Sequence, residues 1–450
     1  MTDGFDAGGA PRVGTDIPGP RSRELWARDA HFHGSNSSPP AQWLGLVLEE
    51  GRGAVVRDVD GNLFVDFSSG AVVANLGHAP PPVVAALTEE AGRLMHYFDW
   101  ATPPRAAFFE ALARTLPPAL QTFQMYSTGA EAVEAALRLA KSYTGNYEVI
   151  SFHQAWHGRT LGAMSLMGGF PLKRGYGPFA PGVAHSLNPN CYRCPLDLSR
   201  KDCEVACARL VDRVYEQSGE QKLAAVIVEP VQGVGGVIPF PPEFLAHLRD
   251  LCHRAGALLI FDEILTGVGR TGPMWAFEAS GVVPDVLLAG KGLGCGYPMS
   301  LIASRREVLD GEPFGRPGAG ASTFASGNMA CAAGVATLGM LEDGSILANG
   351  RKVGASMLAA LRDLADRHPV IGDVRGVGML MALELVADRT TKAPVPPATV
   401  RRLVLALARR GVLVAGAGAV LRITPPLVID EEMALHGVGL LDEALAEVAG

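Results

Sequence analysis

The 450-residue sequence has few cysteines, no excess of positive charge and no long apolar run. Seven cysteines are too few for a disulfide scaffold in a chain of this length. The net charge of −7, without a lysine and arginine cluster, argues against a nucleic-acid-binding surface. No run approaches the roughly 18 apolar residues that span a bilayer, and the first residues lack the apolar segment of a secretory signal. We therefore expect a cytoplasmic protein without nucleic-acid or membrane partners.

The composition is typical of a globular protein with more than one folding unit. Hydrophobic residues make up 48% of the chain and charged residues 19%, which suffices for a large core. The first 20 residues are rich in Gly, Pro and Asp, and we expect a flexible tail over residues 1–20.

Helical patterns alternate with short apolar runs between about residues 80 and 305, at 148–152, 224–230, 257–263 and 285–291. This alternation predicts an α/β sheet with helices on its faces. Beyond residue 326, helical patterns surround a few short strands, which predicts a smaller α+β domain. We place the large domain at residues 76–325 and the small domain at 21–75 and 326–450.

Three of the apolar runs end in a polar residue of a different kind, namely Glu229, Asp262 and Lys291. Ligands gather at the carboxyl ends of strands in open α/β sheets, so these residues predict a common pocket. The alternative is that each is merely the first solvated residue after its strand. Lys291 weakens that alternative, because it stands alone between Gly290 and Gly292 after an apolar run.

An amine that loses hydration among apolar neighbours gives up its proton more readily and becomes a nucleophile toward aldehydes and ketones. Lys291 is therefore a candidate for Schiff-base formation, and the adjacent glycines would let a bulky cofactor approach the backbone. An enzyme that uses pyridoxal 5'-phosphate (PLP) also needs a phosphate cradle, a carboxylate for the pyridine nitrogen and packing on the ring faces.

The sequence offers a candidate for each of these three parts. Thr128 and Gly129 precede a helical pattern, and Thr128 forms an S/T-x-x-E capping box with Glu131, so this helix start would present amides to a phosphate. Asp262 is the candidate for the pyridine nitrogen, and Trp156 is the candidate for ring stacking. The alternatives are an ordinary capped helix, a turn cap and a core aromatic residue.

At this point the pattern resembles the class III aminotransferases, which are fold-type I PLP enzymes and include the ornithine and 4-aminobutyrate aminotransferases. The resemblance is carried by STGAEA, HQAWHGRT, IVEPVQGVGG, LIFDEILTGVGRTG, AGKGLGCGYP, STFASGNMACAA, VRGVGM and VLRITPPL, in this order. The segments IPGPRSRELWARD and DVDGNLFVDFSSG are also similar to a subgroup that contains amino-acid racemases. The resemblance implies a large mixed-sheet α/β/α domain that binds PLP and a smaller α+β domain.

The resemblance also implies roles for residues at matching positions. Lys291 would form the Schiff base with PLP and move protons, while Asp262 would pair with the pyridine nitrogen. The other expected contacts are the amides of Gly129 and Ala130 on the phosphate, Trp156 over the ring and Ile264 under it, Thr323 on the phosphate from the second subunit of a homodimer, Arg422 on the substrate α-carboxylate, and Arg159 on a distal acid group.

Two positions depart from many relatives. Leu265 stands in place of a glutamine that helps to hold the phenolic oxygen of the cofactor, and Val234 stands in place of a glutamate. In relatives this glutamate masks the carboxylate-binding arginine when an ω-amine is bound. We therefore expect α-amino acid or simple amine substrates rather than strict 4-aminobutyrate or ornithine specificity.

The leading expectation is a PLP-dependent aminotransferase that moves an amino group from an amino acid or amine to a 2-oxo acid. A racemase, epimerase or lyase of the same fold is the first alternative, because all of them begin with the same proton abstraction. A non-catalytic binding or scaffold protein is the alternative from another class, although it would not need Lys291, Asp262, Thr323 and Arg422.

Four cysteines lie outside this argument, at Cys191, Cys194, Cys203 and Cys207. Their C-x2-C and C-x3-C spacing is compatible with a structural zinc site. The alternative is a surface insertion with reduced or oxidisable thiols, because the spacing departs from common zinc motifs.

Overall fold

The computed structural model describes residues 8–217 and 219–449, which divide into two compact units. One unit contains residues 82–343, and the other combines the segment up to Pro81 with the segment from Gly344 onward. The boundary between residues 343 and 344 lies beyond the boundary at 326 that the sequence suggested. The reason is that α12 (Asn328–Leu341) packs against α5 (Pro103–Ala113). There, Gly334 of α12 lies so near the Phe108 ring that an added Cβ would come within 2.4 Å of it.

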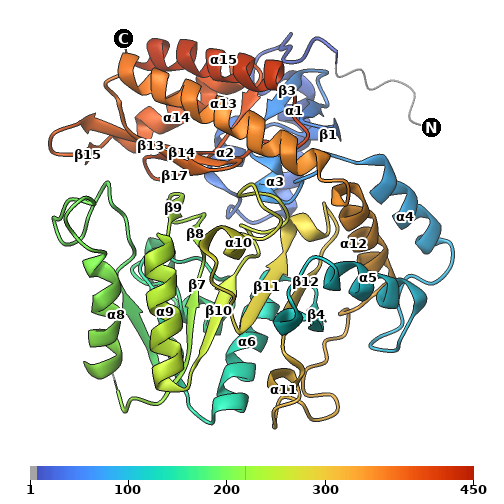
Figure 1. Ribbon diagram of the computed structural model, residues 1–450. Helices are drawn as coiled ribbons and strands as arrows, with labels where there is room; N and C mark the ends of the chain where they lie inside the picture. Colours follow the sequence, from blue (N-terminus) through green and yellow to red (C-terminus); the bar gives the residue numbers. More distant parts are fainter. Residues whose placement is uncertain (1–7, 218, 450) are drawn as a thin grey trace. The chain divides into compact units, whose positions relative to one another are not determined.

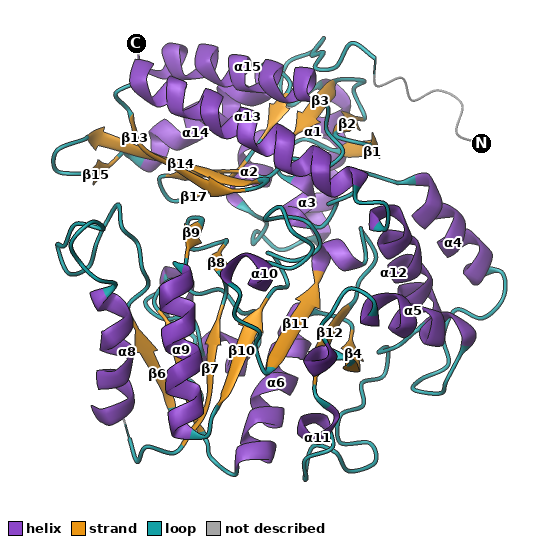
Figure 2. Cartoon of the chain, in the orientation of Figure 1, coloured by secondary structure: helices purple, strands orange, loops and turns teal. Residues whose placement is uncertain are grey.

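A seven-stranded mixed sheet forms the centre of the 82–343 unit (Figure 2). Six of its strands run in the same direction, and β12 is the reversed strand, because it is antiparallel to both of its neighbours, β11 and β4. The strand order is β4 (Thr122–Tyr126), β12 (Ser300–Ser304), β11 (Val286–Gly290), β10 (Leu258–Asp262), β7 (Leu223–Val228), β5 (Glu148–Phe152) and β6 (Val183–Ser186).

Helices cover both faces of this sheet. Val149 of β5 belongs to the core that α6 (Gly129–Thr144) shares with the sheet. Phe152 of the same strand places its ring 5.7 Å from that of Phe244 on α9 (Pro242–Ala255). Because residues an odd number of positions apart on a strand face opposite sides, α6 and α9 lie on opposite faces. The predicted α/β/α layering is confirmed.

The remaining elements of this unit are shorter or lie at its periphery (Figure 1). They are α4 (Pro81–Ala91), η1 (Pro118–Leu120), α7 (Leu161–Ser165), η2 (Pro171–Lys173), α8 (Ala206–Gln217), β8 (Val231–Gln232), β9 (Ile238–Pro239), α10 (Phe277–Ser280), η3 (Lys291–Leu293) and α11 (Arg306–Leu309). Among the described residues, no single helix is long and apolar enough to cross a membrane. One bent pair, α12 with α13 (Ser345–Arg367), meets the length and composition test when the two helices are taken together.

The other unit contains two small sheets and the helices that cover them. One sheet has the order β1 (Leu48–Arg52), β2 (Val55–Asp58), β3 (Leu63–Asp66) and β16 (Val412–Leu413). The second has the order β13 (Ile371–Val377), β14 (Leu380–Asp388), β18 (Val420–Ile423) and β17 (Ala415–Ala417), with β15 (Ala393–Pro394) beside β14. The helices are α1 (Pro20–Phe32), α2 (Pro39–Leu44), α3 (Ser69–Val72), α13 (Ser345–Arg367), α14 (Pro397–Arg409) and α15 (Glu431–Ala449). This α+β content agrees with the prediction.

The predicted flexible tail falls partly outside the described residues, which begin at Gly8. Within the described part, Arg12 and Leu63 exchange two backbone hydrogen bonds of 2.9 and 2.8 Å. The side-chain oxygen of Asn62 accepts hydrogen bonds from the N–H groups of Gly14 and Thr15. Residues 12–15 are therefore held against the β2–β3 hairpin by hydrogen bonds that composition does not reveal.

Candidate active site

Three neighbouring strands bring the acids and the lysine of the sequence analysis to one edge of the large sheet. In the parallel register, Val228 of β7 lies opposite Phe261 of β10, and Asp262 lies opposite Leu288 of β11. Asp262 ends β10, and Glu229 and Lys291 come after β7 and β11, so all three lie at the same carboxyl edge of the sheet. That they line a common pocket stays a prediction.

Lys291 begins the η3 turn directly after β11 and has a φ of +45°. A side chain with a positive φ is strained, and such strain clusters at functional sites. The glycines around Lys291 permit a tight turn: a Cβ at Gly294 would lie 2.0 Å from the carbonyl oxygen of Tyr297. The backbone that follows the lysine is thus closely packed against the Tyr297 segment.

Ile264 connects this turn to the start of α6. A Cβ at Gly129 would approach Ile264 Cδ1 to 3.0 Å, and one at Gly290 would approach Ile264 Cγ2 to 3.5 Å. Ser300 of β12 adds a 2.6 Å hydrogen bond from its hydroxyl to the carbonyl oxygen of Thr128. The helix start and the lysine turn therefore lie against the same side chain.

The capping box at the start of α6 is present with both of its hydrogen bonds. Thr128 Oγ1 accepts a bond from the N–H of Glu131, and Glu131 Oε2 accepts bonds of 2.9 Å from the N–H groups of Ser127 and Thr128. The amides of Gly129 and Ala130 belong to the first turn, where a helix offers no acceptor of its own. With the positive end of the helix dipole, they form a cradle suited to a phosphate.

Asp262 is buried, with 4% exposure, and is paired with His157. His157 Nδ1 lies 2.7 Å from Asp262 Oδ2, and the other carboxylate oxygen accepts a 3.1 Å bond from the N–H of Ile264. Burial alone would lower the pKa of His157, but the hydrogen bond and charge of Asp262 outweigh it, so the pKa is raised. His157 Nε2 is buried and has no hydrogen-bond partner among the described residues.

Trp156 lies half-buried directly before His157. Its ring is 5.2 Å from that of Phe170 at 66°, and the Arg159 guanidinium carbon lies 5.4 Å from the Trp156 ring centroid. This cation–π contact gives Arg159 a partner on the protein itself.

Thr323 and Arg422 lie in different parts of the chain. Thr323 is exposed, in a loop whose neighbouring Ser322 donates a 3.1 Å hydrogen bond to Glu131 at the start of α6. Arg422 belongs to the other compact unit, on β18, where it pairs with Ala382 of β14 and Ala415 of β17.

The zinc hypothesis is not supported. Within residues 8–217 and 219–449, no group of three or more His, Cys, Asp or Glu side chains is arranged to hold a metal ion. Cys191 is exposed, while Cys194, Cys203 and Cys207 are half-buried free thiols. Burial raises the pKa of the Cys207 thiol, which disfavours the thiolate that zinc requires.

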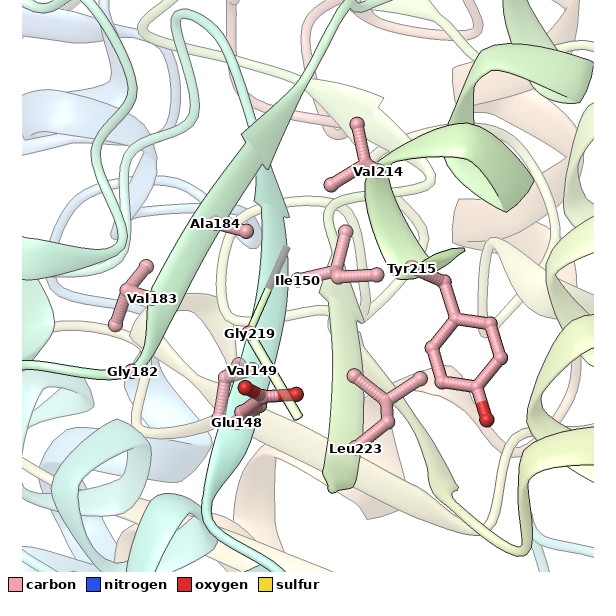
Figure 3. A pocket seen from close by; sticks show the side chains of 10 residues that line it. All are labelled: Glu148, Val149, Ile150, Gly182, Val183, Ala184, Val214, Tyr215, Gly219 and Leu223. Atoms are coloured by element: carbon pink, nitrogen blue, oxygen red, sulfur yellow. The ribbon is translucent and has the colours of Figure 1, made fainter. Parts of the chain in front are cut away.

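A cavity lies at the amino edge of the sheet, opposite the edge that carries Glu229, Asp262 and Lys291. A cavity of about 150 Å³ is bordered by the first residues of β5, β6 and β7, with Val214 and Tyr215 of α8 on one side (Figure 3). Its acid, Glu148, accepts backbone hydrogen bonds of 2.8 and 3.0 Å from Glu220 and Lys222. These bonds occupy both carboxylate oxygens, so Glu148 holds the loop rather than offering a free group to a ligand.

Solved structures identify the fold. An amine transaminase from an uncultivated Pseudomonas species, crystallised in its PLP-bound form, matches with a TM-score of 0.87 and 32% identity, over 93% of this chain and 98% of that one. The chain has the fold of PLP-dependent transaminases.

Sequence comparisons identify the family. The family model described as aminotransferase class-III matches residues 37–445. The 5-aminovalerate aminotransferase DavT of Pseudomonas aeruginosa is 34% identical over 412 residues, covering 90% of this chain and 94% of the relative. The 4-aminobutyrate aminotransferase of Mycobacterium bovis is 34% identical over 458 residues, covering 97% and 98%. The chain belongs to the class III aminotransferases: it is an enzyme that transfers amino groups from an amino donor to a 2-oxo acid and uses PLP.

The residues at the carboxyl edge fit this cofactor. A buried carboxylate at Asp262 suits a protonated pyridine nitrogen, and the first turn of α6 suits a phosphate. His157 and Ser300 were not predicted as site residues, although His157 bonds to Asp262 and the Ser300 hydroxyl bonds to the carbonyl oxygen of Thr128. His157 was adjacent to Trp156 in the sequence, but its pairing with Asp262 is formed only by the fold.

Proposed function

We propose that Lys291 is the residue that bonds to PLP and that the enzyme acts on α-amino acids or simple amines. The observation that carries this proposal is the register of β10 and β11, which brings Lys291 to the same sheet edge as Asp262. PLP, when bound, supplies an aldehyde for the amine and a ring that accepts electrons.

The side chains of the protein then have separate tasks. The Lys291 amine would hold the cofactor at its aldehyde and would move the proton at the substrate carbon. Asp262 would stabilise a proton on the pyridine nitrogen, and the His157 hydrogen bond orients this carboxylate. The remaining proposed contacts are the amides of Gly129 and Ala130 on the phosphate, Trp156 and Ile264 on the two ring faces, Arg422 on the substrate carboxylate and Arg159 on a distal acid group.

The proposed functional form is a homodimer in which Thr323 contacts the phosphate held by the partner subunit. Exposed apolar side chains support an interface: Trp100 is 68% exposed and Phe324 is 69% exposed. The Phe324 ring lies 5.3 Å from that of His96, so the Thr323 loop and the 94–100 segment form one surface. Apolar surface of this kind is typical of protein–protein interfaces.

The proposed substrate class depends on Val234 and Leu265. Leu265 is buried, and a Cβ at Gly233 would come within 2.5 Å of its side chain, so the residues before Val234 pack on an apolar neighbour. A valine at 234 offers no carboxylate to neutralise an arginine. We therefore infer that the glutamate that masks the carboxylate-binding arginine in relatives has no counterpart at position 234, and we propose Arg422 as the residue that binds the α-carboxylate of an amino acid.

A single-turnover panel tests the substrate class. The PLP-loaded enzyme is mixed with L-alanine, 1-phenylethylamine, 4-aminobutyrate or 5-aminovalerate without a 2-oxo acid, and loss of the near-visible cofactor absorbance is followed. L-Alanine or the simple amine should react at least about tenfold faster than either ω-amino acid. In the Val234→Glu variant this preference should shrink or reverse. Equal rates for 4-aminobutyrate and L-alanine in the wild type would contradict the proposed substrate class.

A further inference from the structure

Glu229 is a buried acid at the carboxyl edge to which the proposed reaction assigns no task. It follows β7 directly and is 4% exposed. Because Val228 lies opposite Phe261, Glu229 leaves the sheet beside Asp262. Burying a carboxylate is costly unless hydrogen bonds replace the lost hydration, so its partners indicate what it does.

The two carboxylate oxygens of Glu229 bind two different segments. Oε1 accepts a 2.8 Å hydrogen bond from the N–H of Trp156, and Oε2 accepts a 3.2 Å bond from the N–H of Gly233. Trp156 is the residue proposed to stack on the cofactor, and Gly233 precedes Val234. One carboxylate therefore joins the ring-stacking segment to the loop of the substrate-specificity position.

Close packing restricts both segments to this arrangement. A Cβ at Gly235 would lie 2.4 Å from the carbonyl oxygen of Gln154, so the two backbones are almost in contact. Gln232 adds a 3.0 Å hydrogen bond from its amide to the carbonyl oxygen of His153. Glu229 is the ionisable member of this junction and the one that accepts a hydrogen bond from the N–H of Trp156.

The charges at this junction are interdependent. Burial raises the pKa of Glu229 to about 7, while the charge of His157 lowers it and that of Asp262 raises it. His157 therefore interacts with both acids, through a hydrogen bond to Asp262 and through its charge on Glu229. A change at Glu229 alters the charge balance around the carboxylate proposed for the pyridine nitrogen.

We propose that Glu229 is a positioning residue of the cofactor site: its carboxylate fixes Trp156 and the 233–234 loop in one arrangement and balances His157 and Asp262. This inference rests on the roles proposed above for Trp156 and Asp262. It predicts that weakening Glu229 changes how the cofactor is held, even where the fold is retained.

The test compares PLP-loaded wild type with Glu229→Gln, Glu229→Asp and Glu263→Gln. Glutamine keeps one acceptor but turns an NH2 group toward the second amide, and aspartate keeps the charge but is too short to reach both amides. Glu263→Gln is a matched control: Glu263 is 1% exposed and accepts backbone bonds of 2.6 and 2.8 Å from Ala276 and Phe277, away from Trp156. The measurements are the cofactor-band circular dichroism, the rate of PLP loss on dilution, and the urea midpoint.

Both Glu229 variants should lose PLP about ten- to hundredfold faster than the wild type and show a changed cofactor dichroism. Glu263→Gln should shift the urea midpoint about as much as the Glu229 variants do. Its cofactor dichroism and its rate of PLP loss should equal those of the wild type. If the Glu229 variants match the wild type or the control in both cofactor measurements, Glu229 is only structural and the inference is wrong. Should one variant fail to fold, the other decides. A wild type that binds no PLP would instead overturn the proposed function.

Discussion

The two edges of the large sheet are built from the same strands but differ in how their acids are used. At the amino edge, beside the cavity of Figure 3, both oxygens of Glu148 are occupied by backbone amides. At the carboxyl edge, Asp262 is bound to the side chain of His157, whose second nitrogen has no partner among the described residues.

This difference shows what separates a hollow from a site. Glu148 stabilises a loop, because both of its carboxylate oxygens accept hydrogen bonds from backbone N–H groups. The carboxyl edge combines a lysine in the left-handed region, a buried histidine–carboxylate pair and a helix N-terminus, which together are typical of a functional site.

Lys291→Ala should give the largest effect, a loss of activity of at least about a thousandfold, because it removes the amine that we propose bonds to the cofactor and moves the proton. The near-visible absorbance of the bound cofactor should also disappear. Lys222→Ala, at the amino edge, should retain both properties. Steady-state rates and absorbance spectra of the two variants check this, and residual activity within tenfold of the wild type would contradict the role of Lys291.

Asp262→Asn and Glu148→Gln should separate the two edges further. Asp262→Asn should lower activity by about a hundredfold or more with the fold retained, because it removes the carboxylate that we propose pairs with the pyridine nitrogen. It should also lower the pKa of His157, since the hydrogen bond and charge of Asp262 are what raise it.

Glu148→Gln should do the reverse, with normal activity and an unfolding free energy reduced by about 1–3 kcal/mol, because one backbone amide loses its acceptor. Kinetics and urea unfolding of both variants provide the measurements. The contrast between the edges would be lost if Glu148→Gln impaired turnover as strongly as Asp262→Asn.

Glu263 should give the smallest effect, and one that appears only in stability. Burial raises its pKa from 4.5 to about 7, although amide bonds from Ala276 and Phe277 oppose the shift. The folded state thus holds the proton more tightly, so ionisation of Glu263 reduces stability as the pH rises from 4.5 to 7, and this loss is complete above pH 7. When the pH is raised from 5 to 8, the free energy of unfolding of Glu263→Gln should fall by about 1–3 kcal/mol less than that of the wild type. Urea unfolding at the two pH values checks this, and parallel pH dependences would contradict it.

Much of the fold near the site could be predicted from local sequence. The apolar run at 148–152 has the same bounds as β5, and the Thr128–Glu131 capping box forms both expected hydrogen bonds at the start of α6. β2 and β3 form an antiparallel hairpin around Asp60-Gly61, a local signal for such a turn. These elements depend on periodicity and on contacts between residues close in sequence, which a single sequence contains.

Other parts could not be predicted in this way. β12 links β4 to the rest of the sheet and is antiparallel to both of its neighbours, although β4 and β12 are far apart in the sequence. His157 and Asp262 are 105 positions apart, and Glu229 binds the amide of Trp156 from 73 positions away. No local pattern encodes such pairs, because they depend on strand order and register.

By itself, the sequence determined the chemistry that this protein can perform: the residue types at the strand ends, the capped glycine start of α6 and the motifs of the family. The tertiary structure decided which polar side chains are buried next to one another and which backbone amides they bind. The physical reason is that the cost of burying a charge depends on partners that only folding brings within hydrogen-bond distance.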